Sequence, residues 1–573
     1  MPGGLLNLVA YGNQNVILNG NPTKTFFKTT YAKYSNFGLQ RFRLDFNGQR
    51  ALRMTDQSVF EFTVPRYADL LMDTYLVVNL PNIWSPIVPP ICDDSAITPS
   101  HPAYNWQRYE FKWIDNLGSQ LIDTVRFKVG GQIIQELTGQ YILNMVERDF
   151  DDAKKDLFYR MTGNVAELND PANANSRNGF YPNAAAPPSP NGFGAAGVEP
   201  SIRGRQLYVP LNIWFTMAAK MAFPLVALQY SELTIELTLR SVQDLFVVRS
   251  ISTRADELVA GHYIQADPTG GTYGFYKFLQ TPPIGYPAVY EDKRTQWNAD
   301  VHLVATYCFL SDDEVRFFAG QPQNYLVREV YTTLYENVVG TRKIDVRSLG
   351  MVSNYMWFLQ RSDAYMRNEW SNYTNWPYKH IPYNVEPVIT PTHPLGLAAN
   401  TSGYDCSGYG TIYPDENAAG DPYPMSLTGM YKVSNVKDIM LTWGLLLDGK
   451  YREDPQPVGI YDYVEKYTRT SGGAKEGLYC YNFCLHTSPT DFQPSGAMNM
   501  SKFTTTEFEL TTTLPVLDPS AQFQTICNNE GTIIGTIKPA WGVYQYTYNM
   551  VVMEERYNVL KFVSGTAGLE WAR

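Results

Sequence analysis

Short runs in which apolar and polar residues alternate recur along the whole chain, and this pattern constrains the fold more than any other feature. In Ser231–Arg240, four aliphatic residues alternate with Thr and Glu, so an extended backbone buries one face and exposes the other. The runs 125–129 and 132–137 are separated by Gly130 and Gly131, which tolerate the positive φ angles of a tight hairpin. Other strand-like runs lie at 59–64, 74–80, 300–310, 324–334, 351–359, 439–447 and 503–510. The pattern predicts antiparallel strands.

Helical patterns are short and rare. Ser311–Ala319 begins with a serine at the N-cap position and has Glu314 three residues later, which is the arrangement of a capping box. A second candidate helix covers residues 143–158. A parallel sheet needs a helical crossover between consecutive strands, and too few stretches of this chain could supply one. The sequence therefore favours antiparallel β-sandwiches.

The length of 573 residues exceeds what one hydrophobic core usually fills, so we expect two domains. A boundary fits near Gly320, after the short helix and before the strand pattern at 324–334. Each half then holds about eight strand patterns, which is the strand count of a jelly roll. We predict an all-β chain of two tandem eight-stranded jelly-roll β-sandwiches, 26–320 and 321–573, with long surface loops and a few short helices.

Three stretches rich in Pro, Gly and Asn predict long surface loops, at 84–104, 163–205 and 369–425. Loops of this length either make contacts on an exposed face or are tolerated insertions.

Charge and cysteine content limit the classes of function. The formal net charge is -10 and no cluster of Lys and Arg occurs, which argues against direct nucleic-acid binding. The six cysteines are scattered, as expected for a reducing compartment without a disulfide framework. The chain starts without the pattern of a signal peptide, and no apolar run approaches the roughly 18 residues of a membrane span.

Two glycine-rich stretches imitate nucleotide-binding motifs. Gly192–Gly197 matches G-x-G-x-x-G, but prolines flank it where a strand and a helix are required. Gly444–Lys450 approaches a phosphate-binding loop, but Tyr451 stands where a Ser or Thr must bind magnesium. We interpret the second stretch as the end of a buried strand that turns at Asp448 and Gly449.

Catalytic and metal-binding patterns are equally weak. Cys480, Cys484 and His486 lie on a stretch that looks extended, where residues four apart are roughly 13 Å apart and cannot share one ion. The acidic clusters Asp149–Asp152 and Asp312–Glu314 are more typical of helix N-termini or a solvated surface than of a catalytic pair. We predict no catalytic residue, cofactor or metal.

Three Asn-x-Ser/Thr sequons are candidate glycosylation sites, at Asn372, Asn400 and Asn499. The first two lie in the longest predicted loop, where a glycan would be tolerated.

Four segments carry a family resemblance. The first runs from Gly3-Gly-Leu-Leu-Asn-Leu-Val to Lys-Thr-Phe-Phe-Lys-Thr-Thr-Tyr31. The others are Phe223–Tyr230, Tyr307–Ala319 leading into Tyr325-Leu-Val, and Gln493–Ser501. In these segments the chain resembles the major capsid proteins of nucleocytoplasmic large DNA viruses, and the resemblance extends to about Leu560.

The resemblance implies a structural subunit, not an enzyme, with two jelly rolls packed side by side. Three copies would form a homotrimer, a pseudo-hexagonal capsomer that tiles an icosahedral shell together with neighbouring trimers. It also implies that residues 1–25 face the shell interior, near minor capsid and penton proteins and an internal virion membrane, while long loops rise outside. The implied location is the virion capsid, made and assembled in the host cytoplasm.

The 41 Tyr and 11 Trp leave one alternative from another class, a carbohydrate-binding or carbohydrate-active β-sandwich whose aromatic rings stack on sugars. Most of these aromatic residues occupy alternating strand positions, so we expect them in the core.

Overall fold

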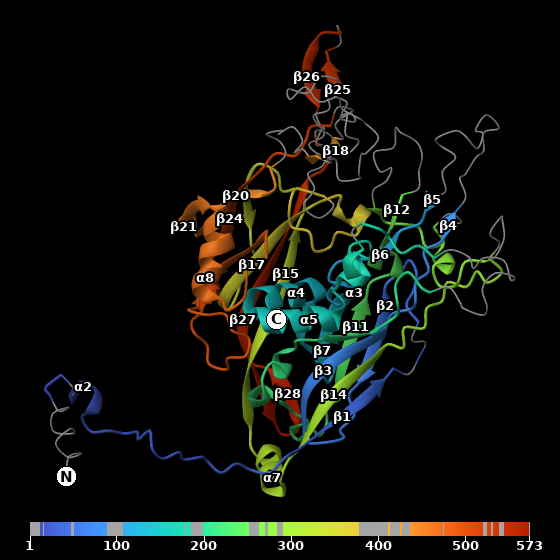
Figure 1. Cartoon of the computed structure of the whole chain (residues 1–573). Coiled ribbons are helices and arrows are strands. Elements are labelled where there is room, and N and C mark those ends of the chain that lie inside the picture. Colours follow the sequence, from blue (N-terminus) through green and yellow to red (C-terminus); the bar gives the residue numbers. More distant parts are fainter. Residues whose placement is uncertain are drawn as a thin grey trace.

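Antiparallel sheets provide most of the regular structure in the computed structural model of this chain (Figure 1). All the named strand pairs are antiparallel, as the alternating patterns predict. The structure describes residues 12–14, 16–46, 48, 51–88, 107–177, 179–184, 199–250, 263–269, 273–283, 290–377, 411–412, 425–426, 436–473, 475–518, 524–528, 531–537 and 544–571.

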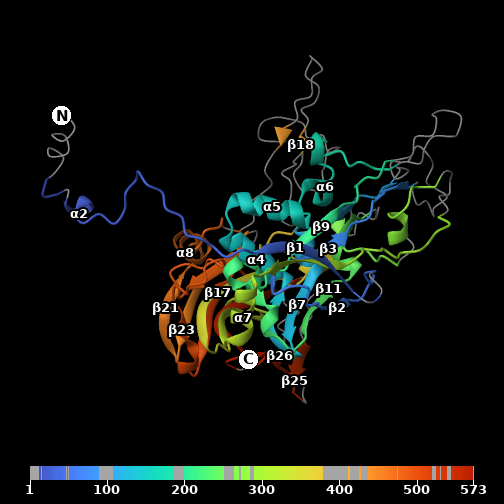
Figure 2. The ribbon, with the colours of Figure 1, turned by 90° about the horizontal axis from the view of Figure 1, so that it is seen from below.

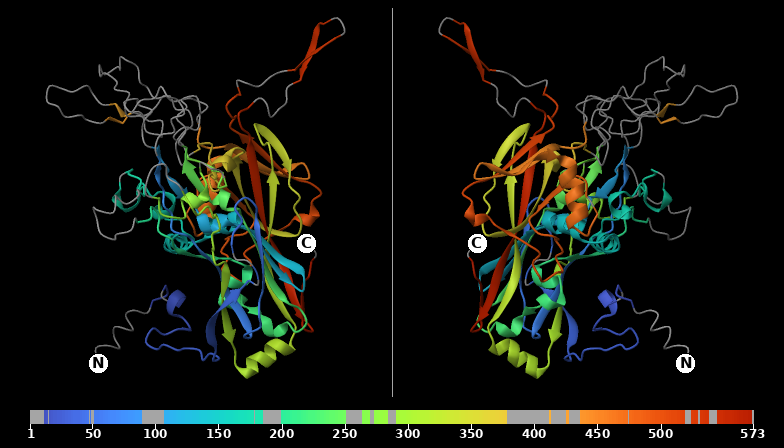
Figure 3. Two further views of the ribbon diagram at one scale, coloured as in Figure 1. Left: turned by 90° about the vertical axis from the view of Figure 1, so that its right-hand side faces the viewer. Right: turned by 90° about the vertical axis from the view of Figure 1, so that its left-hand side faces the viewer.

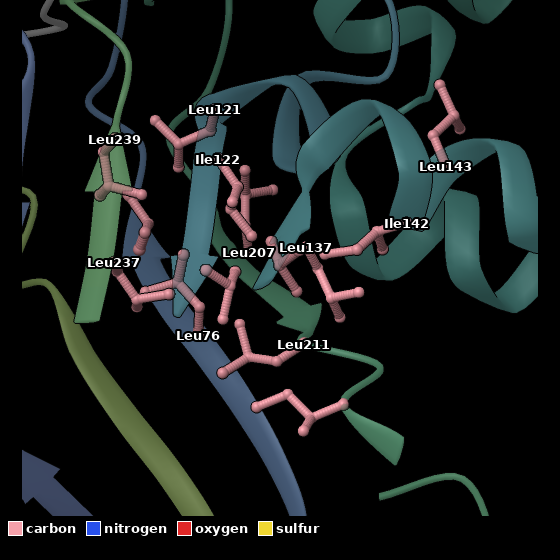
Figure 4. Close-up of a cluster of buried hydrophobic side chains, with 14 of the residues drawn as sticks. Leu76, Leu121, Ile122, Leu137, Ile142, Leu143, Leu207, Leu211, Leu237 and Leu239 are labelled. Carbon is pink, nitrogen blue, oxygen red and sulfur yellow. The ribbon is translucent and has the colours of Figure 1, made fainter. Parts of the chain in front are cut away.

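The first sandwich is built from two main sheets that share one core. The five-stranded sheet consists of β1 (Gly38–Asp45), β14 (His302–Phe309), β3 (Leu70–Asn79) and β10 (Phe223–Pro224), with β9 (Gln206–Pro210) also paired to β3. The four-stranded sheet runs β2 (Ser58–Thr63), β11 (Leu233–Leu239), β7 (Ile122–Val129) and β8 (Gln132–Thr138). Figure 4 shows Leu76, Leu237 and Leu137 from these strands gathered in the same cluster.

Two local predictions for this sandwich are confirmed. On β11, Leu233, Ile235 and Leu237 are buried, while Glu236 on the other face forms an ion pair with Arg126 of β7 at 3.0 Å. β7 and β8 form a hairpin across Gly130 and Gly131, whose φ angles are 55° and 83°. Both glycines therefore adopt the left-handed conformation that this tight turn requires.

The second sandwich also has two main sheets. The six-stranded sheet runs β15 (Gln323–Tyr335), β27 (Tyr548–Val563), β17 (Met351–Arg361) and β22 (Leu478–Asn482), with β23 (Met498–Asn499) on β17 and β28 (Thr566–Leu569) on β27. The four-stranded sheet runs β16 (Thr341–Asp345), β24 (Thr506–Thr512), β20 (Met440–Leu447) and β21 (Lys450–Pro457). Trp357 and Trp443 stack between the sheets with ring centroids 4.5 Å apart.

The six-stranded sheet is a wall between two cores, and we call it the shared sheet. On β17, Tyr355, Trp357 and Leu359 face the core of the second sandwich. Met356 and Phe358 point to the other side, where they join the core of the first sandwich. Because both faces are covered, β17 is buried almost continuously, and its sequence is an apolar run with little alternation. Figure 2 shows the two sandwiches side by side.

Smaller pairings complete the strand inventory of the described residues. These are a three-stranded sheet of β13 (Tyr263–Ile264), β12 (Phe246–Arg249) and β6 (Phe111–Trp113), and the pairs β4 (Ile87–Val88) with β5 (Gln107–Arg108), β18 (Thr411–Ile412) with β19 (Met425–Ser426), and β25 (Gln524–Cys527) with β26 (Ile533–Ile537).

The helices are few and short in the part of the chain that the structure describes. They are α2 (Val16–Asn19), α3 (Leu117–Leu121), α4 (Gly139–Asp149), α5 (Asp152–Thr162), α6 (Ala166–Asn169), α7 (Asp312–Gly320) and α8 (Glu465–Arg469), with a π-helical turn, η9 (Ile460–Val464), directly before α8. None of these described helices has the length and apolar content to cross a bilayer.

Three details differ from prediction. The expected helix at 143–158 is two helices, because Phe150 is extended and the Asp151 side chain accepts a hydrogen bond from the Lys154 N–H to start α5. α7 has its expected N-cap, but the Ser311 hydroxyl donates to Glu314 Oε2 at 3.2 Å instead of accepting from the backbone, so no capping box forms. The predicted loop 163–205 contains α6.

Candidate assembly site

The two sandwiches meet where the last turn of α4 presses against the shared sheet. α4 follows β8 directly and buries most of its length, so its C-terminal residues reach the strands of the second sandwich. Five polar residues gather there from four elements, and we call them the junction cluster. They are Arg148 and Asp149 of α4, Arg328 of β15, Asn354 of β17 and Glu555 of β27.

Arg148 is the centre of the junction cluster. Its Nη2 atom lies 2.7 Å from Asp149 Oδ2 and 2.7 Å from Glu555 Oε1, and its Nη1 donates to Asn354 Oδ1 at 2.9 Å. The side chains of Arg148, Asp149 and Glu555 are 0% exposed. Asn354 Nδ2 in turn donates to Glu555 Oε2 at 2.9 Å, and Arg328 Nη1 lies 3.4 Å from that oxygen. The buried charges are therefore paired and hydrogen-bonded.

The charges of the junction cluster balance, with two guanidinium groups against two carboxylates. Burial acts to raise the pKa of Glu555, but the positive charges of Arg148 and Arg328 hold it below its ordinary value. Glu555 is therefore ionised and supplies the counter-charge to both arginines. Removing one partner from such a cluster leaves an uncompensated buried charge, which typically costs about 3–5 kcal/mol. The cluster thus favours one arrangement of the two sandwiches.

The sequence did not reveal this cluster. Asp149 belongs to an acidic stretch that we interpreted as a helix N-terminus or a solvated surface, and for Asp149 this is wrong, because it ends α4 and is buried. The interpretation is confirmed for Asp152 and for the Asp312–Glu314 group, which lie in the first turns of α5 and α7. The available signal was the charged triplet Glu554-Glu555-Arg556 inside a long apolar strand.

The segment before β1 forms an arm that leaves the body (Figure 1). We call residues 16–37 the N-terminal arm, and all of them are exposed. Phe26, Phe27 and Tyr31 are 86%, 99% and 88% exposed. Ser35 Oγ donates to Glu314 Oε1 at 2.6 Å and joins the end of the arm to α7. A concentration of exposed aromatic side chains of this kind is typical of a segment that binds a partner.

A second exposed apolar surface lies on the helical segment η9–α8. Tyr463, Val464 and Tyr467 are 60%, 53% and 91% exposed and are spaced so that they share one helical face. The neighbouring edge strand β21 carries four charged residues and two prolines among its eight residues. An aromatic centre beside a charged rim is the usual composition of a protein–protein interface.

Of the two stretches that imitate nucleotide-binding motifs, the structure describes one and explains its sequence. Gly444–Lys450 is the end of β20 and a tight turn, with φ of 48° at Asp448 and 73° at Gly449, so the strand interpretation is confirmed. Gly192–Gly197 lies outside the described residues.

The structure separates the thiols from the one histidine proposed with them. Cys480 and Cys484 are buried, and burial raises the pKa of the Cys480 thiol to about 11. His486 is exposed, with Nε2 3.7 Å from Asp491 Oδ2. Among the described residues, no three His, Cys, Asp or Glu side chains are grouped to hold a metal ion.

The largest buried aromatic side chains lie in the two cores. Trp113, Trp357 and Trp443 are fully buried and in contact with other rings. These tryptophans cannot stack on a sugar, so this geometry gives no support to a carbohydrate-binding site.

The sequons differ in their surroundings. Asn372 is half-buried, its Nδ2 donates to Trp376 O at 2.7 Å and its Oδ1 accepts from Thr374 Oγ1 at 2.8 Å. Asn499 is exposed, and its Oδ1 accepts from the Ser501 N–H. Asn400 lies outside the described residues.

Two family models match the chain, and together they span both sandwiches. The model described as "Major capsid protein N-terminus" matches residues 25–280, and the model described as "Large eukaryotic DNA virus major capsid protein" matches residues 314–568. The major capsid protein of Phaeocystis pouchetii virus is 26% identical, and that of Paramecium bursaria Chlorella virus 1 is 24% identical. Each match covers 100% of both chains.

Solved structures share the fold. A quasi-atomic model of the PBCV-1 virus capsid matches with a TM-score of 0.57 at 19% identity, over 96% of this chain and 100% of that one. The Faustovirus major capsid protein matches with a TM-score of 0.58 at 14% identity, over 94% and 93%. The fold is therefore that of the double jelly-roll capsid proteins. The chain belongs to the major capsid proteins of large eukaryotic DNA viruses, a structural family that forms icosahedral capsids.

Proposed function

We propose that this capsid protein works as a homotrimer whose three pairs of sandwiches form one pseudo-hexagonal capsomer, and that neighbouring capsomers tile the shell. The observation that carries the proposal is the shared sheet, which places the two sandwiches side by side on a common wall. The junction cluster adds buried ion pairs across the same contact. A subunit with two fixed lobes presents six lobes when three copies surround an axis.

We assign residues 26–320 to the first jelly roll and 321–573 to the second. β14 pairs in the first sandwich and β15 in the second, and α7 connects them. The two family matches support this division, since one ends at residue 280 and the other begins at residue 314.

The contacts within a trimer should be large and apolar, burying more than about 2,000 Å² in total, as in other obligate complexes. The exposed face of Tyr463, Val464 and Tyr467 is a candidate for such a contact. Contacts between trimers should be smaller and more polar, so that misplaced capsomers can dissociate during assembly.

The N-terminal arm and residues 1–25 would face the shell interior. The exposed rings of Phe26, Phe27 and Tyr31 suit apolar partners there, which we expect to be minor capsid proteins, penton proteins at the vertices, or the surface of an internal membrane. Assembly in the host cytoplasm agrees with the scattered cysteines, of which Cys308, Cys480, Cys484 and Cys527 are free thiols.

Glycosylation remains a prediction for all three sequons. Asn499 is the better acceptor of the two described, because the amide nitrogen of Asn372 is already hydrogen-bonded. Peptide mass spectrometry of virion protein would test this order, and a glycan on Asn372 with none on Asn499 would contradict it.

Native mass spectrometry tests the trimer. The chain has a mass of 65.0 kDa, and the expected species has three times that mass. The double substitution Tyr463→Asp and Tyr467→Asp should shift the population toward single subunits without changing the circular dichroism spectrum. A wild-type protein that stays a monomer at micromolar concentration would contradict the proposal.

A further inference from the structure

We propose that the β25–β26 hairpin is an assembly element that pairs with the same hairpin of neighbouring copies of this chain. This inference rests on the trimer proposed above. The hairpin projects from the body at the end opposite α7 (Figures 1 and 3). It is inserted between β24 and β27, and the bridge between Leu517 and Tyr544 joins the two connections at its base.

The hairpin is too small to be stable alone. It has two strands, and no third described strand pairs with either of them. Isolated two-stranded hairpins are at best marginally stable in water, and three or more strands or a covering element are needed. This one must therefore gain stability from a contact outside the described part of its own chain.

Three isoleucines of the hairpin are exposed. Ile533 and Ile534 are 64% and 67% exposed, and Ile526 on the partner strand is 41% exposed. The described part of the chain therefore leaves these three isoleucines uncovered. Leu514 and Leu517, in the connection from β24, are 59% and 64% exposed and extend this apolar surface toward the body.

The edges of the hairpin lack the protection seen on other edges of the same chain. β21, one edge of the four-stranded sheet, has four charged residues and two prolines in eight positions. β16, the other edge, has three charged residues in five positions. Such residues keep exposed strand edges from pairing with other chains. β25 and β26 contain neither charged residues nor proline, so their edges are open to pairing.

A second copy of the chain is the partner that fits these features. An uncharged edge meets no repulsion from an identical uncharged edge, and a capsid subunit assembles with copies of itself. Around a threefold axis, β25 of each hairpin can pair with β26 of the next copy. The three hairpins then form a closed ring in which no strand edge remains free. Pairing of this kind takes each hairpin beyond the three strands that stability requires, and closure of the ring buries the side chains on its inner face.

Cys527 at the end of β25 provides a direct test. It is exposed, whereas Cys308, Cys480 and Cys484 are buried. Cys92 and Cys406 lie outside the described residues, so the experiment uses the full chain with Cys92→Ser and Cys406→Ser. The native mass of this variant is measured first. The protein is then treated with a short flexible bismaleimide, and the cross-linked and free chains are separated under denaturing conditions.

The expected product is a covalent dimer, because each chain then has one accessible thiol. Adding Ile533→Asp and Ile534→Asp should lower the yield of dimer at least about tenfold, since like charges on an edge strand oppose its pairing with an identical copy. The matched control moves the thiol to the charged edge β16, as Lys343→Cys with Cys527→Ser, and should give no dimer.

Two outcomes would overturn the inference and are distinguishable. Trimers of the expected mass in which Cys527 does not cross-link would show that the hairpins stand apart or bind a different protein, and would leave the proposed capsomer intact. A protein that is monomeric before cross-linking would refute the trimer, and the hairpin pairing with it.

Discussion

The shared sheet and the N-terminal arm are both rich in large apolar side chains, but the chain covers only the first of them. Met356 and Phe358 of the shared sheet are fully buried, whereas Phe26 and Phe27 of the arm are almost fully exposed. The buried region also contains a charged cluster, which fixes how its two sides meet. The difference separates two roles, since one region holds the two sandwiches together and the other exposes apolar side chains, which we propose bind partners.

The largest effect on the folded subunit should come from the junction cluster. Arg148→Met removes the cation between two buried carboxylates and should lower the free energy of unfolding by about 3–5 kcal/mol. Chemical denaturation measures this. The control is Arg160→Met, whose ion pair with Asp156 is exposed and should contribute less than about 0.5 kcal/mol. Equal effects of the two substitutions would show that the junction is not held by this cluster.

A packing variant sharpens the contrast between buried and exposed side chains. Met356→Ala should cost about 2–5 kcal/mol, because it leaves a cavity on the side of the shared sheet that faces the first sandwich. Met366→Ala is the matched control, since that side chain is 56% exposed and its loss should change stability by less than about 0.5 kcal/mol. A neutral Met356→Ala would mean that the two sandwiches are not packed through this wall.

A smaller, pH-dependent effect is expected at Asp363. Burial acts to raise the pKa of Asp363, but hydrogen bonds from Arg361 and Arg367 hold it well below its ordinary value. A lowered pKa contributes stability that is present above the ordinary pKa and is lost as the pH falls below it. Asp363→Asn should therefore cost about 1–3 kcal/mol at pH 7 and progressively less in acid. A cost that is independent of pH would contradict this assignment.

The smallest effect on the subunit should come from deleting residues 2–34. These include most of the exposed arm, so the free energy of unfolding should change by less than about 0.5 kcal/mol. Trimers should still form, while attachment to the inner components of the shell should be lost, as measured by co-purification with disrupted virions. A large loss of subunit stability would show that the arm folds onto its own chain.

The sequence predicted those features that depend on neighbouring residues. The alternation in β11, the turn at Gly130 and Gly131, and the start of α7 are all local patterns, and each is confirmed. The break between α4 and α5 was missed because Asp151 can serve either as a helical residue or as an N-cap, and its neighbours do not distinguish the two.

The junction depends on contacts that local patterns do not encode. Arg148 and Glu555 are separated by 407 positions, and nothing near either residue identifies the other. The run 351–359 predicted a strand, but it did not indicate that one face of β17 belongs to the first sandwich. The exposure of Phe26 and Phe27 was equally hidden, because an apolar pair in a sequence looks the same in a core and on an arm.

Electron microscopy of the purified protein tests the central claim most directly. We predict particles with a hexagonal outline, each containing three copies with paired sandwiches at its six corners. Solitary subunits, or particles in which the two sandwiches of one chain separate, would contradict the account.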